Sequence, residues 1–136
     1  MPRIRTTPSR NRGQASVEFL LSSVFFLTMI FAAVQLILVI YTYVLMAEAA
    51  KIGVRYAVVH GSNSISASGP GNTTGVQNAV KRIVNYSGMT ITVTYPDGNG
   101  DPPSRVRVQV SYPFSAFSLG WPLPTIRASA QGRITF

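Results

Sequence analysis

The sequence predicts an α+β protein with a long N-terminal membrane helix that continues into a stem, followed by a small domain of one amphipathic helix and a three-stranded antiparallel sheet. Three observations predict this fold. A long uncharged run lies near the N-terminus, one later segment repeats apolar residues at helical spacing, and three further segments alternate apolar and polar residues. A chain of 136 residues suffices for one compact core beside an anchor.

The uncharged run is long enough to span a membrane. No Asp, Glu, Lys, Arg or His occurs between Glu18 and Glu48. As a helix, the stretch from Phe19 to Ala47 measures about 43 Å, whereas the hydrocarbon core of a bilayer is about 30 Å thick. A soluble domain this small has too little chain to cover so long a helix on all sides. Tyr41 and Tyr43, near its far end, are typical of the headgroup level.

Basic residues set the expected orientation. Lys51 and Arg55 after the run are partly offset by Glu48, whereas no carboxylate offsets the arginines before Gly13. Those arginines are Arg3, Arg5, Arg10 and Arg12. We therefore expect a basic cytoplasmic leader over residues 1–13, a transmembrane helix and stem over 14–60, and an extracytoplasmic α+β domain over 61–136. Because the leader carries half of the net charge of +8, the charge does not indicate nucleic-acid binding.

The stem begins with small residues that allow three interpretations. Ala47 and Ala49 form an A-x-A pattern, but the h-region of a cleaved signal peptide has about 7 to 15 residues, far fewer than this run. Ala49, Gly53 and Ala57 form a small-xxx-small ridge that would admit a neighbouring helix closely. The high helix propensity of alanine explains the alanines equally well.

A short motif precedes the membrane run. The segment RGQASVEF from Arg12 to Phe19, then the apolar helix, then AAKIGVRYA, resembles the TadE/TadG-like proteins, minor pilin-like components of the tight-adherence (Tad or Flp) pilus system. The resemblance implies that prepilin peptidase cuts after Gly13, that Gln14 becomes the mature N-terminus, and that Glu18 is the fifth mature residue. Phe19 stands where TadE-like precursors have tyrosine, and Gln14 stands where many type IV pilins have an N-methylated phenylalanine.

The same resemblance implies the setting in which the protein works. We expect a non-enzymatic, single-pass, pilin-like assembly component of a bacterial Tad-type pilus or secretion machine. It would reside in the inner membrane with the N-terminus in the cytoplasm, or be incorporated into the pilus. Its expected partners are the membrane, prepilin peptidase and other pilin-like or Tad assembly subunits, with no nucleic acid and no small-molecule substrate.

Glu18 is the charged residue at the N-terminal, cytoplasmic edge of the membrane run. A carboxylate near hydrocarbon is costly and is a functional candidate by default. After cleavage it would lie one helical turn from the new amino group at Gln14, or close to that of a packed neighbour, and such pairing would offset the cost. The alternative is that Glu18 only favours the start of the helix through the helix dipole.

The remaining elements follow in order. The pattern from Gly61 to Gly75 is rich in turn formers and predicts a loop. An amphipathic helix follows, and we expect Gly88 to stop it. The apolar positions that predict this helix are Val76, Ala79, Val80, Ile83 and Val84. Period-two alternation predicts strands over 89–95, 105–112 and 126–136, the first two joined as a hairpin by residues 96–104.

Two surfaces of the domain are candidates for partner binding. The polar face of the sheet carries Arg105, Arg107, Arg127 and Arg133, which would either dock an acidic partner or form a solvated basic face. An uncleaved single-pass receptor or binding module that uses this face is the alternative function. The loop from Phe114 to Leu123 is apolar and would touch a partner or the bilayer, or fold Trp121 back over the core.

No catalytic set or cofactor site emerges from the sequence. There is no cysteine, no G-x-S-x-G elbow and one histidine, His60, which we expect to interact with the end of its helix. Residues 97–101 imitate the start of a calcium loop, but Pro102 replaces the required glycine and Val108 the bidentate glutamate. This segment is therefore predicted to be a hairpin turn, and we expect no catalytic residue, bound metal or cofactor.

Overall fold

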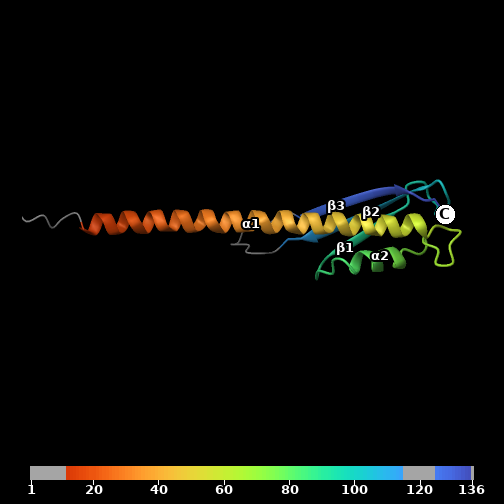
Figure 1. Ribbon diagram of the computed structural model, residues 1–136, viewed down its shortest axis with the longest axis horizontal. Coiled ribbons are helices and arrows are strands. Elements are labelled where there is room, and N and C mark those ends of the chain that lie inside the picture. Colours follow the sequence, from red (N-terminus) through yellow and green to blue (C-terminus); the bar gives the residue numbers. More distant parts are fainter. Residues whose placement is uncertain (1–11, 115–124, 136) are drawn as a thin grey trace, which may run out of the picture. The chain divides into compact units, whose positions relative to one another are not determined.

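The computed structural model describes residues 12–114 and 125–135. They form α1 (Arg12–Val59), α2 (Thr74–Lys81), β1 (Thr90–Thr94), β2 (Arg105–Pro113) and β3 (Thr125–Arg133), as Figure 1 shows. The strands make one antiparallel sheet in the order β1-β2-β3, which confirms the predicted α+β fold. Residues 1–11 of the leader and the segment around Trp121 lie outside the described residues.

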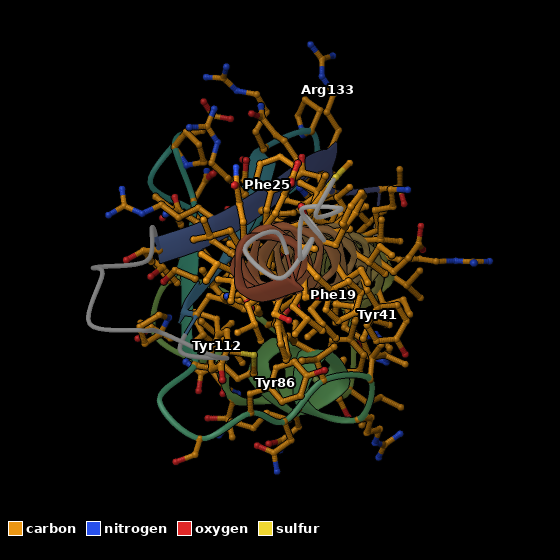
Figure 2. All side chains as sticks on the ribbon, turned by 90° about the vertical axis from the view of Figure 1, so that its left-hand side faces the viewer. Phe19, Phe25, Tyr41, Tyr86, Tyr112 and Arg133 are labelled. Carbon is orange, nitrogen blue, oxygen red and sulfur yellow. The ribbon has the colours of Figure 1, made fainter. Side chains whose placement is uncertain are left out.

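The chain divides into two compact units, and the division falls inside α1. The first unit runs to Leu36 and the second from Ile37 to Phe136. In the first unit nearly every side chain that the structure describes is exposed, and these side chains are mostly large and apolar. Phe25, labelled in Figure 2, keeps 67% of its surface exposed. This helix is long and apolar enough to cross a membrane.

The sheet of the second unit has one buried face and one exposed face. Val106, Val108 and Val110 of β2 are fully buried, while the intervening Arg105 and Arg107 are exposed. Val108 lies opposite Val93 of β1 and Ala130 of β3, so apolar residues of all three strands meet on one side. The β-branched residues at every second position favour this half-buried sheet, as the alternation predicted.

The second half of α1 packs on the buried face of the sheet through its small residues. A Cβ on Gly53 would lie 2.6 Å from Val80 Cγ2 of α2 and 3.2 Å from Val108 Cγ1 of β2. Ala49 and Ala57, one turn before and after Gly53, have no exposed surface. The predicted small-residue ridge therefore packs closely against the chain's own α2 and sheet, which occupy the place expected for a neighbouring helix.

The short helix α2 ends earlier than expected. The amide groups of Ile83 and Val84 both donate to the carbonyl of Val80, so the helix tightens and stops after Lys81. Gly88 was wrongly predicted to terminate it. Gly88 instead has φ +81° and lies in a turn in which the amide of Met89 donates to the carbonyl of Tyr86, just before β1. Glycine tolerates this left-handed conformation at no steric cost.

Candidate membrane anchor and processing site

The first turn of α1 contains the predicted cleavage position. Gly13, Gln14, Glu18 and Phe19 are all exposed, and a Cβ on Gly13 would meet nothing within 4 Å. The bond between Gly13 and Gln14 lies in the first turn of α1, which begins at Arg12. Amide groups in a first helical turn have no partner inside the helix, so this turn unwinds at low cost. Among the described residues nothing covers this bond.

Glu18 follows Gln14 by four residues, which places the two on the same face of α1. A shallow depression on this face is bounded by Gly13, Gln14, Val17, Glu18, Leu21 and Ser22. In the described part of the chain Glu18 makes no ion pair. The carboxylate is thus one helical turn from the residue whose amino group cleavage would release, and it is open to a second molecule.

The two parts of the uncharged run have different surroundings. Thr42 and Met46 are buried, with 7% and 0% of their surfaces exposed, and Leu38 packs against the same core. Before Ile37 nearly all described side chains of the run are exposed. The stretch from Phe19 to Ile37 measures about 28 Å as a helix, close to the roughly 30 Å of a hydrocarbon core. The apparent excess length of the run is therefore used in packing the domain.

The two threonine hydroxyls in the run are satisfied within the helix. Thr28 Oγ1 donates to the carbonyl of Val24, and Thr42 Oγ1 donates to the carbonyl of Leu38, both at 2.8 Å. Bonds of this kind allow threonine to lie in an apolar environment without an unpaired polar group. Both threonines are therefore compatible with a membrane helix.

The four arginines of the predicted partner surface are all exposed but do not form one group. Arg105 and Arg133 are cross-strand partners and Arg107 follows on the same face of β2, so these three lie together. Arg127 lies opposite Ser111, about 20 Å along β3 from Arg133. We name Arg105, Arg107 and Arg133 the arginine cluster. The structure thus brings three of the four residues together and separates the fourth.

Hydrogen bonds tie part of the arginine cluster to its own domain. Arg105 Nη2 donates to Asp97 Oδ1 at 2.7 Å, and the backbone amide of Arg105 donates to Asp97 Oδ2, also at 2.7 Å. Arg107 Nη2 donates to Gln131 Oε1 at 3.0 Å. The side-chain hydrogen bond from Arg105, with its backbone bond and the nearby charge of Arg133, lowers the pKa of Asp97 to about 2.

The same contacts account for the loop that imitates a calcium site. Gly98 has φ +79° and its amide donates to the carbonyl of Tyr95, so the chain turns here between β1 and β2. Both carboxylate oxygens of Asp97 already accept hydrogen bonds from Arg105. No group of three or more metal-ligating side chains occurs within residues 12–114 and 125–135.

A groove of about 460 Å³ lies between the end of α1 and α2, within the second unit. Its lining residues are Ile52, Arg55, Tyr56, Val59, His60, Gly75, Asn78, Ala79, Arg82 and Ile83. The ring of His60 stacks on Tyr56 with centroids 4.0 Å apart, and its Nδ1 lies 3.0 Å from the Tyr56 carbonyl oxygen. Among the described residues that line the groove there is no carboxylate to orient His60 as a general base.

The comparisons with known proteins bear on α1. Residues 13–55 match the family model described as TadE-like protein. No curated protein and no solved structure matches the chain. The match begins at Gly13, includes Glu18 and the whole uncharged run, and ends in the stem beside the sheet. TadE-like proteins are structural pilus components and not enzymes. Residues 13–55 are therefore similar to TadE-like proteins and contain a helix able to span a membrane, as the sequence resemblance predicted.

Proposed function

We propose that this protein is a membrane-anchored, pilin-like assembly component of a Tad-type pilus or secretion machine, and that prepilin peptidase cleaves it between Gly13 and Gln14. One observation carries the proposal. The TadE-like match starts at the glycine, which is followed by a carboxylate at the fifth position after the cut and by an exposed apolar helix. The other features of α1 are consistent with this order.

The chemistry of the processed end supports assembly with other subunits. Cleavage would create an α-amino group at Gln14, one turn from Glu18. In a medium of low dielectric constant the two opposite charges attract strongly, and pairing offsets the cost of placing each near hydrocarbon. A pair formed between two molecules would fix the register of neighbouring helices. The exposed apolar side chains that follow on α1 would then pack against those of neighbours.

The distribution of charge supports an orientation with the N-terminus in the cytoplasm. Arginines precede the uncharged run without a compensating carboxylate, and the positive-inside rule retains such segments on the cytoplasmic side. In this orientation the scissile bond faces the side on which prepilin peptidase acts. The sheet and α2 would then lie beyond the inner membrane, where other assembly subunits would contact them.

The test is the intact mass of the protein after co-expression with the cognate prepilin peptidase. We expect the mass of the chain that begins at Gln14. Gly13→Val and a catalytically inactive peptidase should each leave the full-length mass, because the first blocks the substrate and the second the enzyme. Retention of residues 1–13 beside an active peptidase would refute the processing step.

We infer a second contact surface at the arginine cluster. Arg133 makes no ion pair with the described residues, although Arg105 beside it pairs with Asp97. An acidic surface of a partner subunit would complement it. Arg133→Glu should therefore reduce pilus assembly or secretion more than Arg82→Glu, which makes the same charge change at an exposed arginine outside the cluster. Equal effects of the two variants would argue against the cluster as a contact surface.

A further inference from the structure

Within the second unit, one side of α1 is covered by the domain from Leu38 onward, whereas another side stays apolar and exposed as far as Val44. On one face Leu38, Thr42 and Met46 pack against the domain. On other sides of the same stretch apolar side chains remain exposed by half or more of their surface. They are Ile37, Ile40, Tyr41, Tyr43 and Val44. The helix is thus already part of the domain on one side while it is still apolar and uncovered on another.

We name these exposed residues from Ile37 to Val44 the apolar stripe. Charged residues follow on the same side of α1 only one turn after Val44. Glu48 and Lys51 form an exposed ion pair at 2.9 Å, and Arg55 follows on the same side of the helix. The uncovered face is therefore compatible with lipid up to Val44, whereas the covered face begins at Leu38. These positions are six residues apart, or about 9 Å along the helix.

The contacts between α1 and the strands place one end of the domain beside the stretch of α1 from Leu38 to Val44. Gly53 lies against Val108 of β2, and Gly132 of β3 lies against Val54. From Val108 to the end of β2 is about 16 Å, and from Gly132 back to the start of β3 is about 23 Å. At 1.5 Å per residue the first distance leads back along α1 to about residue 42 and the second to about residue 39. Figure 1 shows β2 and β3 running beside this part of α1.

This end of the domain, which we name the near end, comprises residues 85–88, 111–113 and 125–127. The rings of Tyr86 and Tyr112 lie 5.2 Å apart at an angle of 39°. Figure 2 shows these two tyrosines beside each other and Tyr41 on a different side of α1. Arg127 is exposed on β3, and residues 85–88, 111–113 and 125–127 contain no carboxylate. Asp97 and Asp101 lie in the loop at the opposite end of the strands.

We propose that the near end of the domain lies in the phospholipid headgroup layer of the leaflet from which α1 emerges. This inference rests on the proposed membrane anchor. Tyrosine favours the headgroup level, and arginine hydrogen-bonds and neutralises lipid phosphates. The headgroup layer is about 5–8 Å thick on each side of the hydrocarbon core. This thickness is similar to the distance of about 9 Å along the helix from Leu38, where the covered side begins, to Val44, where the exposed apolar side ends. With the domain held clear of the lipid, the apolar stripe up to Val44 would stand in water.

A second protein molecule is the competing cover for the stripe. A neighbouring α1 packed on Ile37, Ile40 and Val44 would remove these side chains from water without bringing the near end into lipid. The near end favours lipid because it combines tyrosines with Arg127 and contains no acidic group to pair with a second copy of this basic chain. The experiment must therefore distinguish lipid from protein contact.

The absence of cysteine allows a single spin label at a chosen position of the full-length chain. Ser87→Cys labels the near end and leaves the tyrosines intact, and Asn85→Cys provides a second exposed position there. Ile65→Cys labels a fully exposed residue in the loop after α1, beyond the far end of the domain. Phe25→Cys labels the anchor. Each protein is placed in nanodiscs of phosphatidylcholine and phosphatidylglycerol, and label accessibility to oxygen and to a water-soluble nickel chelate is measured.

We expect oxygen accessibility to dominate strongly at Phe25→Cys, to be intermediate at Ser87→Cys and Asn85→Cys, and to be least at Ile65→Cys. Adding Tyr86→Ser or Tyr112→Ser should move the Ser87→Cys label towards the aqueous value. Circular dichroism confirms that each variant keeps its fold. An aqueous label at Phe25→Cys would refute the anchor itself. A lipid-exposed Phe25→Cys beside near-end labels that match Ile65→Cys, or that neither reagent reaches because protein covers them, would overturn the headgroup contact alone.

Discussion

The stretches on either side of the Leu36–Ile37 boundary share one uncharged run but have different environments. From Phe19 to Leu36 nearly all described side chains are exposed, whereas from Ile37 to Ala47 one side of the helix joins the core of the domain. Thr28 in the first stretch is exposed and Thr42 in the second is buried, although both bond to the carbonyl four residues earlier. Hydropathy alone therefore does not show where the anchor ends, because lipid and a protein core both accept apolar side chains.

Two methionines in the run provide the sharpest test of this difference. Met46 has no exposed surface and Met29 keeps 62% exposed. Met46→Ala should lower the free energy of unfolding of the domain by about 2–5 kcal/mol, because it leaves a cavity in the core. Met29→Ala should change that free energy by less than about 0.5 kcal/mol. Denaturant unfolding of the full chain in detergent micelles, followed by near-ultraviolet circular dichroism, measures both; similar losses would contradict the division.

A charge placed in each stretch tests the same boundary from the membrane side. Phe25→Arg should raise the apparent free energy of membrane insertion by about 2.5–3.5 kcal/mol, because it places a guanidinium group near the bilayer centre. Tyr43→Arg should cost much less, because the long side chain reaches the headgroups from the interface. Insertion assays with a reporter fused after α1 compare the two. A larger cost at position 43 would place the membrane further along the helix than we infer.

The sequence sufficed to predict the element order and the sheet, and physical reasons explain where prediction failed. Alternation of valine with polar residues in β2 predicts which face is buried, and residues 105–113 follow it closely. Within an uncharged run no such contrast exists, so the burial of Thr42 and Met46 left no readable pattern. The position of Arg105 and Arg107 beside Arg133, and not beside Arg127, depends on strand register, which composition does not encode.

The small-residue ridge around Gly53 is another feature that the sequence predicted only in part. The spacing of Ala49, Gly53 and Ala57 indicated close packing but not the partner, which is the chain's own sheet and α2. Gly53→Ala should destabilise the domain by about 1–3 kcal/mol, because the new methyl group would crowd two buried, stiff valines. Gly13→Ala is the matched control in the same helix, with nothing within 4 Å of the added carbon. A neutral Gly53→Ala, measured by thermal unfolding, would show that the ridge is loosely packed.

The smallest expected effect concerns charge and is confined to the second unit. Because Arg105 lowers the pKa of Asp97 to about 2 in the folded state, the stabilisation from this pair is complete above about pH 4 and is lost as the pH falls towards 2. Asp97→Asn and Arg105→Gln should each slightly lower the melting temperature at pH 7 and flatten its dependence between pH 4 and pH 2. Both groups are solvent-exposed, so added salt should weaken the effect. An unchanged pH profile in both variants would mean that the pair joins the loop to β2 without stabilising the sheet on which α1 packs.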